Sequence, residues 1–185
     1  KEGELTTELR DEDKVMVGKS YVAPWQGGFG TTLTWKGLSL SAQFAWVADR
    51  WMINNDRYFD ESNGRFVSFN QSKRLLDRWK KPGDITDIPR HGVYTEFDDR
   101  LLEDASFLRL SSLTVGYTLP ASWTRKVRIN KVRLYATGTN LFCWTGYSGF
   151  DPEVDTRRST PLTPGVDYSP YPKTRGFIVG LNLTF

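Results

Sequence analysis

The stretch GFIVGLNLTF, residues 176–185, decides the fold class of this chain. Every second position in it carries a large apolar side chain, and the positions between are small or polar apart from Ile178. The apolar positions are Phe177, Val179, Leu181, Leu183 and Phe185. A period of two predicts a β-strand, because successive side chains of a strand point to opposite faces. Such a strand fits a soluble core, and it equally fits a membrane barrel with apolar residues towards lipid and polar residues towards the lumen.

Four other segments show the same alternation, near residues 25–35, 38–49, 107–118 and 131–140. The second is the clearest, and we expect its apolar residues to face lipid: Leu38, Leu40, Ala42, Phe44 and Trp46. The alternation in the third segment changes register, which predicts a β-bulge near Ser111 and Ser112. Residues 70–81 predict a short helix that Pro82 and Gly83 end.

The lengths of the connections separate a barrel from a sandwich. Segments 50–104 and 141–175 are long, whereas residues 36–37 and 119–130 form short connections. Antiparallel strands alternate in direction, so both short connections fall at one end of the sheet and both long ones at the other. Outer-membrane barrels show this asymmetry, with short periplasmic turns and long extracellular loops. We therefore expect an all-β chain, an antiparallel transmembrane β-barrel segment of about five strands with long extracellular loops.

The composition of the 185 residues excludes several classes of function. The net charge is only +3 and the basic residues form no stripe, which argues against a nucleic-acid partner. The single Cys (Cys143) excludes a disulfide framework and a cysteine metal site, and the single His (His91) excludes a metal site or catalytic triad that needs a second His. We expect no enzyme and no cofactor. We interpret Asp151, Glu153 and Asp155 as a loop held by Asx turns rather than as catalytic carboxylates.

Three segments together resemble a known family. They are LEDASFLRLSSLTVGYTLP at 102–120, VRLYATGTNLFCWTGYSGFDPEV at 132–154 and YPKTRGFIVGLNLTF at 171–185. In this order they resemble the C-terminal barrel segment of the SusC/RagA family of TonB-dependent outer-membrane transporters of Bacteroidetes. RWKKPGDITDIPR, at 78–90, is a weaker match.

The resemblance implies a barrel of about 22 strands whose lumen is plugged. It implies the import of oligosaccharides or peptides, with a SusD-like surface lipoprotein as a lid. It also implies that the TonB complex acts through an N-terminal part that these residues do not contain. The expected location is the cell outer membrane, crossed many times, with the C-terminus towards the periplasm. Since about five strands cannot close such a barrel, we expect the chain to be part of a longer protein.

Aromatic residues lie near the strand ends and in the long segments. Those near strand ends are expected to form an interfacial girdle: Trp25, Trp35, Trp46, Tyr117, Trp123 and Trp144. In the long segments we regard five residues as candidate contacts for a ligand or a lid: Trp51, Tyr58, Tyr94, Tyr147 and Tyr168. Stacking on sugar rings, packing of the loops on one another and contact with a lid protein are open interpretations of these side chains.

The final strand has a further expected role. By the same resemblance, its apolar face is the signal that the barrel-assembly machinery reads: Phe177, Val179, Leu181, Leu183 and Phe185. An assembly factor can hold an unpaired strand by β-augmentation, using its backbone for affinity and alternate side chains for recognition. The alternative to a transporter segment is a soluble, secreted glycan-binding β-module with aromatic loop residues. A hydrolase is disfavoured, because the pattern brings no nucleophile, base and oxyanion donors together.

Overall fold

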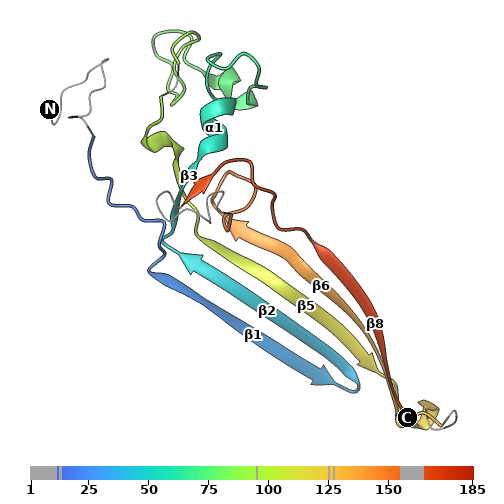
Figure 1. Ribbon diagram of the computed structural model, residues 1–185. Coiled ribbons are helices and arrows are strands. Elements are labelled where there is room, and N and C mark those ends of the chain that lie inside the picture. Colours follow the sequence, from blue (N-terminus) through green and yellow to red (C-terminus); the bar gives the residue numbers. More distant parts are fainter. Residues whose placement is uncertain (1–11, 13, 95, 125, 127, 155–164) are drawn as a thin grey trace.

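A computed structural model describes residues 12, 14–94, 96–124, 126, 128–154 and 165–185. Its main feature is a sheet of five long strands, in which every neighbouring pair is antiparallel. The strands are β1 (Trp25–Trp35), β2 (Leu38–Ala48), β5 (Phe107–Thr118), β6 (Lys131–Thr145) and β8 (Gly176–Thr184), in the spatial order β1-β2-β5-β6-β8. Figure 1 shows this sheet as a single, curved and open layer. The all-β, antiparallel fold expected from the sequence is confirmed, and the sheet does not close among the residues that the structure describes.

A second, smaller sheet lies beyond one end of the long strands (Figure 1). It contains β3 (Trp51–Asn54), β4 (Leu102–Asp104) and β7 (Val166–Asp167), in the order β4-β3-β7. Three short helices accompany it: α1 (Asn55–Asp60), η2 (Lys73–Asp77) and η3 (Asp99–Leu101). The opposite end carries the Lys36–Gly37 turn and α2 (Ala121–Thr124), so the long and short connections are sorted between the two ends. None of the helices among the described residues is long or apolar enough to cross a membrane.

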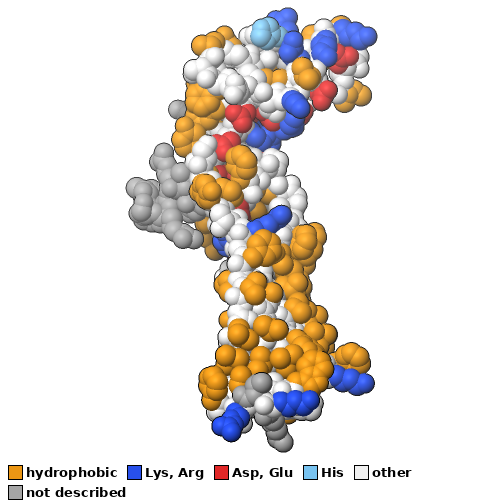
Figure 2. All heavy atoms as spheres, turned by 90° about the vertical axis from the view of Figure 1, so that its right-hand side faces the viewer, with side chains coloured by type: hydrophobic (Ala, Val, Ile, Leu, Met, Phe, Trp, Pro, Cys, Tyr) orange, Lys and Arg blue, Asp and Glu red, His pale blue; other side chains and the backbone are white. Residues whose placement is uncertain are grey.

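The strand register gives the five-stranded sheet two faces of opposite character. One face is apolar on every strand, because Phe29, Phe44, Leu110 and Phe142 follow one another across β1, β2, β5 and β6 in direct register. The rings of Phe29 and Phe44 stack with centroids 4.8 Å apart. The other face is polar or small, and Thr and Ser hydroxyls bond across it, as between Thr114 and Thr137 at 2.8 Å. Figure 2 shows hydrophobic side chains gathered over the strands.

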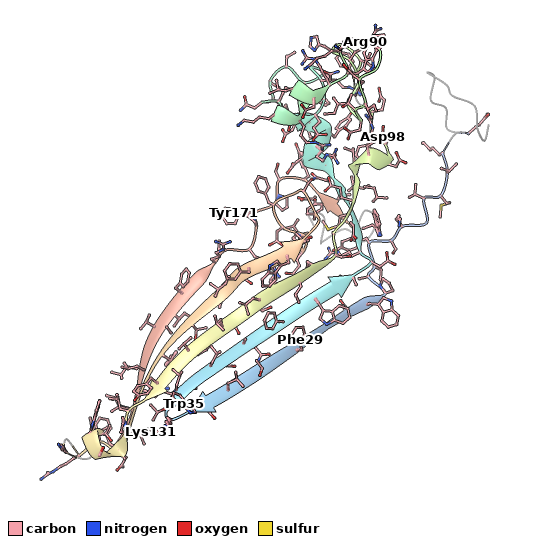
Figure 3. The ribbon with its side chains drawn as sticks, turned by 180° about the vertical axis from the view of Figure 1, so that it is seen from behind. Phe29, Trp35, Arg90, Asp98, Lys131 and Tyr171 are labelled. Carbon is pink, nitrogen blue, oxygen red and sulfur yellow. The ribbon has the colours of Figure 1, made fainter. Side chains whose placement is uncertain are left out.

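The register also places the apolar residues expected to face lipid. Leu38, Leu40, Ala42, Phe44 and Trp46 pair with apolar residues of β5 on the same face. Because no second layer covers this face within the described residues, many of its large side chains are exposed, among them Leu33, Val115 and Val179. A soluble protein of this size rarely leaves so extended an apolar surface open. Figure 3 shows the side chains of the sheet from behind, with Phe29 and Trp35 labelled on β1.

A bulge interrupts the sheet where the sequence predicts one. Ser112 pairs with Thr139, and Leu110 pairs with Phe142, so Ser111 on β5 and two residues on β6 have no direct opposite. One of these β6 residues is Asn140, whose φ of 52° lies in the left-handed region that Asn tolerates. This explains why the expected end of the strand at residue 140 is wrong: the alternation breaks at the bulge, and β6 continues to Thr145.

Two other expectations need correction. The predicted helix over 70–81 is a 3₁₀ helix of five residues, Lys73–Asp77, which the Ser72 side chain caps by accepting a bond from the Arg74 N–H. It ends because Arg78 is extended, with ψ at 154°. The second strand ends at Ala48 rather than at residue 49, because Asp49 has a φ of 55°. The long segment 50–104 is also more ordered than a simple loop, since it contains β3, β4 and three short helices.

Candidate functional site

The long connections fold together into one assembly, which we call the loop assembly and define as residues 49–94, 96–106, 146–154 and 165–175. Its apolar centre contains Met52, Ala105, Tyr147 and Val154, with Tyr21 packed against it. Tyr147 is only 5% exposed, and its hydroxyl donates a hydrogen bond of 2.5 Å to Asp167 Oδ2. Burial, followed by this bond, raises the pKa of Tyr147 well above its usual range. Tyr147 therefore joins the segment after β6 to β7, and it is not available to a ligand in this arrangement.

Glu103 is the centre of a polar network in the same assembly. Its carboxylate accepts bonds from Arg57 Nη1 at 2.8 Å, from Asn54 Nδ2 at 3.3 Å, and from the backbone N–H and hydroxyl of Ser148 at 2.8 Å each. Burial acts to raise the pKa of Glu103, but the bonds from Ser148 and Arg57 outweigh it and hold the pKa below its usual value. Arg57 also pairs with Glu61 at 3.0 Å. The network thus ties α1, β3, β4 and the second long connection into one unit.

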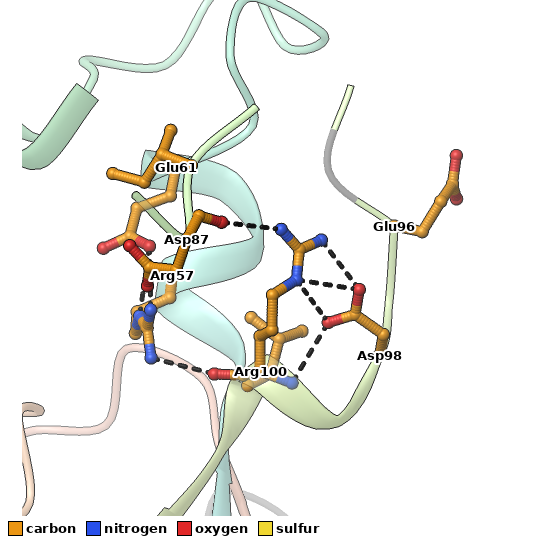
Figure 4. A pocket seen from close by; sticks show the side chains of 8 residues that line it. Arg57, Glu61, Asp87, Glu96, Asp98 and Arg100 are labelled. Carbon is orange, nitrogen blue, oxygen red and sulfur yellow. Dashed lines mark hydrogen bonds and ion pairs between the residues drawn. The ribbon is translucent and has the colours of Figure 1, made fainter. Parts of the chain in front are cut away.

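Two hollows open beside this network. The one in Figure 4 is lined by Arg57, Glu61, Asp87, Ile88, Glu96, Asp98, Arg100 and Leu101, and Arg100 is held there by Asp98 at 2.7 Å. Its volume of about 20 Å³ suits one water molecule and no sugar ring or peptide. The other is an open cleft of about 270 Å³ beside Asp56, Asp60 and Arg74. Burial, with Asp56 and Glu61 nearby, raises the pKa of Asp60 in this cleft.

No group of His, Cys, Asp or Glu side chains in the described parts of the chain is arranged to hold a metal ion. Glu103 and Asp98 are instead bonded to arginines and to backbone N–H groups, and Asp167 is bonded to the Tyr147 hydroxyl. What these groups do chemically is to fix the shape of the loops.

An aromatic cluster forms the outer part of the loop assembly. Phe59 is its centre, with ring centroids 5.0–5.3 Å from those of its neighbours, and its members are Tyr58, Phe59, Phe66, Phe69, Phe97 and Tyr168. Phe69, Phe97 and Tyr168 remain half exposed at its surface. The inner rings of the cluster thus pack this region together, and its outer rings form a surface that a partner can reach.

The structure brings together only some of the aromatic residues singled out from the sequence. Tyr58 and Tyr168 meet through Phe59, whereas Tyr94 is exposed outside the cluster and Tyr147 is buried. Trp51 donates from Nε1 to Asp49 Oδ1, and the Lys19 ammonium lies 3.9 Å from its ring centre. Phe66, Phe69 and Phe97 also belong to the cluster and could not be singled out from the sequence. Their spacing shows no period, and the only signal was the density of Phe between loop-forming residues.

A buried ion pair fastens the second long connection onto the polar face of the sheet. Arg109 of β5 contacts Asp151 at 2.6 Å and Glu153 at 2.5 Å, and Lys173 contacts Glu153 at 2.8 Å. The expected Asx turn is present, since Asp151 Oδ1 accepts from the Glu153 N–H at 3.0 Å. The pairing of Asp151 with Arg109 was not foreseen, and Asp155 lies outside the described residues.

The apolar side chains of the final strand share the apolar face of the sheet. Phe177, Val179, Leu181 and Leu183 pair across β6 in that register, and they and Phe185 are exposed. The proposed girdle residues fall at both ends of the strands, with Trp25, Trp46 and Trp144 near the loop assembly and Trp35 and Tyr117 near the short turns. Trp123 lies in α2, at the short-turn end.

No protein-family model matches this chain. The chain is 36% identical over 121 residues to "TonB-dependent receptor P3" of Formosa agariphila, which covers 63% of this chain and 12% of that protein. It is 38% identical over 88 residues to "TonB-dependent receptor SusC" of Bacteroides thetaiotaomicron, which covers 47% of this chain and 8% of that protein.

Solved structures agree with these relatives. A structure titled "Structure of the RagAB peptide transporter" matches all of this chain and 20% of its own, with a TM-score of 0.86 and 38% identity. The "open-open" state of the RagAB peptide importer matches 97% of this chain with a TM-score of 0.84. The chain thus spans about a fifth of that structure and less than a fifth of the curated relatives. Together with the apolar and polar faces of the sheet, these matches show that the chain belongs to the SusC/RagA family of TonB-dependent transporters, as a segment of the barrel wall.

Proposed function

We propose that this chain forms part of the wall and extracellular loops of an outer-membrane, TonB-dependent importer of oligosaccharides or peptides. The observation that carries the proposal is the single-layer sheet, apolar on one face along all five strands and polar on the other. Lipid requires an apolar outer face and paired backbone groups, and a water-filled lumen requires a polar inner face. Sorting of the long and short connections to opposite ends supports the same reading.

The same sorting supports one orientation in the membrane. We propose that the loop assembly is extracellular, that the Lys36–Gly37 turn is periplasmic, and that the C-terminus points to the periplasm. The relatives support an uptake role: one is named SusC, and the RagAB structures are titled as a peptide importer. TonB would act through a part of the longer protein outside these residues.

The loop assembly is the part proposed to meet a SusD-like lid or the incoming ligand. Of the aromatic candidates, Tyr58, Tyr94 and Tyr168 reach or border its surface, and Phe69 and Phe97 extend the same surface. Half-exposed aromatic side chains on an already folded surface are typical anchors of protein interfaces. They bury a large area on binding and lose little side-chain entropy. Tyr147 and Trp51 support the assembly from within, the first through Asp167 and the second beneath Lys19.

Co-purification from outer membranes tests the lid contact. The full-length parent protein carrying Phe97→Ser and Tyr168→Ser should retain less of its SusD-like lipoprotein than the wild type. Tyr171→Ser is a matched control, because Tyr171 is highly exposed but makes no ring contact with the cluster among the described residues. Equal retention of the lipoprotein by all three proteins would refute the proposed surface. Growth on peptides or on oligosaccharides as the limiting nutrient, with the parent gene deleted and restored, identifies the class of substrate.

The last strand carries a separate proposal. We propose that Phe177, Val179, Leu181, Leu183 and Phe185 form the surface that the assembly machinery reads. β8 supports this, because it is an edge of the described sheet and its apolar side chains are exposed. Deleting Phe185 from the full-length parent should leave the protein degraded or retained in the periplasm. Normal insertion with only slightly lower stability would show that Phe185 is merely an anchor at the interface.

The alternative, a soluble glycan-binding module, requires the apolar face of the sheet to be shielded from water. A soluble module must cover such a face with a second layer, which the described residues do not supply. A transporter wall needs detergent or lipid once it is extracted, and a soluble module does not. Purification of the full-length parent with and without detergent therefore separates the two.

A further inference from the structure

Acidic residues are absent from the parts of the chain that build the large sheet. The sequence contains no Asp or Glu at residues 14–48, 105–150 or 168–185, although it has 22 of them elsewhere. These three ranges hold β1, β2, β5, β6 and β8 and both short connections. Lys and Arg are not excluded from the same ranges, so whatever excludes carboxylates is selective for the sign of the charge.

Two groups of cations in these ranges differ in their partners. Near the loop assembly, Arg109 and Lys173 are neutralised by Asp151 and Glu153. At the short-turn end, Lys36, Lys126, Arg128 and Lys131 are exposed, and none forms an ion pair with a carboxylate of the described residues. We call these four residues the basic rim.

Backbone bonds gather the two short connections at that end. The Thr118 N–H donates to Gly37 O at 2.8 Å, and the Asn130 N–H donates to Thr184 O at 2.8 Å. Figure 3 places Trp35 and Lys131 at this end of the sheet, opposite Arg90 and Asp98 in the loops. Figure 2 shows Lys and Arg below the hydrophobic band, with no Asp or Glu there on the face in view.

Large exposed aromatic side chains accompany the basic rim. Trp35 is 68% exposed and Trp123 is 63% exposed, and the Lys36 ammonium lies 5.1 Å from the Trp35 ring centre. Trp side chains prefer the level of lipid headgroups, between hydrocarbon and water. The chain therefore presents, in order along the strands, an apolar band, tryptophans and then unneutralised cations.

We propose that the basic rim binds the phosphate groups of anionic phospholipids at the short-turn edge of the membrane. This inference rests on the proposed function, since it needs the sheet to be a membrane wall. Lysine and arginine donate charge-assisted bonds to phosphate oxygens, and each cation near an anionic lipid surface adds to the attraction. The acyl chains of such a lipid would cover the apolar band beside the rim. An acidic soluble partner would leave that band uncovered. An occupant with both a phosphate and acyl chains fits the whole surface.

Native mass spectrometry of the full-length parent protein in detergent tests this assignment. The protein is mixed with equimolar phosphatidylglycerol and phosphatidylethanolamine, and the ratio of bound lipids is measured. The variant K126Q/R128N/K131Q removes three rim charges, and Asn at 128 suits the φ of 59° there. The control K73Q/K80Q/K81Q removes three charges from the loop assembly. We expect the wild type and the control to prefer phosphatidylglycerol, and the rim variant to lose that preference by at least about tenfold.

Several results would overturn the inference. One is a wild-type protein that does not prefer phosphatidylglycerol. Another is a rim variant that keeps this preference, and a third is a control variant that loses it as much as the rim variant does. Stronger binding of lipid A than of phosphatidylglycerol, or salt-sensitive capture of an acidic soluble protein without a lipid preference, would also overturn it. Heat-modifiable migration in electrophoresis reports barrel folding separately. A folded barrel without lipid selectivity refutes the basic rim alone, whereas a parent that is soluble without detergent and never heat-modifiable refutes the membrane wall itself.

Discussion

Replacing Arg109 by Met should release the second long connection from the sheet. The Arg109 guanidinium lies on the polar face and pairs with Asp151 at 2.6 Å, and both side chains are about 5% exposed or less. Asp151 Oδ2 also accepts the Lys173 N–H at 3.1 Å, so the same carboxylate holds both ends of the segment 151–173. Met keeps much of the length and apolar stem of Arg but removes the positive charge.

The size of the effect follows from burial. Removing one partner of a buried ion pair costs about 3–5 kcal/mol, because the remaining charge stays buried without its counter-charge. Asp151 keeps two backbone donors, Glu153 and Lys173, so we expect the lower end of this range, about 3 kcal/mol. For a local opening reaction, this corresponds to hydrogen exchange faster by about two orders of magnitude.

Hydrogen exchange at the Lys173 amide of the full-length parent, folded in detergent, measures the opening directly. Arg65→Met is the matched control, because the Arg65 and Glu96 side chains are 35% and 54% exposed and their pair, at 3.2 Å, should contribute about 1 kcal/mol or less. Adding Asp151→Asn to Arg109→Met should cost less than the sum of the single changes, since the two groups interact. Exchange at Lys173 within about threefold of the wild type in Arg109→Met would refute the view that this pair anchors the loop.

Three other changes probe the two faces and the loops. A Cβ on Gly180 would overlap the Tyr135 ring that lies across it, so Gly180→Ala should lower the heat-modifiable fraction of the parent protein, and adding Tyr135→Ala should restore it. Leu40→Arg on the apolar face should cost about 2–4 kcal/mol and reduce the yield in the outer membrane, whereas Ser41→Arg on the polar face should be tolerated; equal yields would contradict the assignment of the faces. Burial and neighbouring carboxylates raise the pKa of Asp167, so its contribution to loop stability is present below the ordinary Asp pKa and is lost as the pH rises through the raised value. Protection of the loops from proteolysis should therefore fall across that range in the wild type and stay flat in Asp167→Asn.

The strands could be predicted from the sequence because the sheet has one apolar face and one polar face. That arrangement imposes a period of two, and β1, β2, β5 and β8 lie within a residue of the expected ranges. The bulge was visible as a change of parity on β5, but its partner on β6 was read as the end of a strand. A bulge and a strand end look alike in one sequence, because both break the alternation, and only pairing with a neighbour tells them apart.

The loop assembly could not be predicted in the same way. Its contacts join residues far apart in sequence, such as Asn54 with Ser148 and Asp56 with Ser169. No period marks such contacts, because each is set by the three-dimensional path of the loops rather than by a repeating face. The acidic trio illustrates the difference: its local turn was foreseen, whereas the pairing of Asp151 with Arg109, 42 residues away, was not.

The absence of acidic residues from the five long strands affects how the second long connection docks on the sheet. Lipid explains why the apolar face has no carboxylates, but it does not explain their absence from the polar face, where Arg109 and Arg133 are accepted. A carboxylate elsewhere on that face would offer a second partner to the wall cations and compete with Asp151 and Glu153. Because the wall itself has no acids, the buried Arg109 is matched by charge only when the second long connection lies in its observed position. The absence of acidic residues from the long strands therefore favours a single docked position of this loop, and it ties the polar face of the sheet to the shape of the loop assembly.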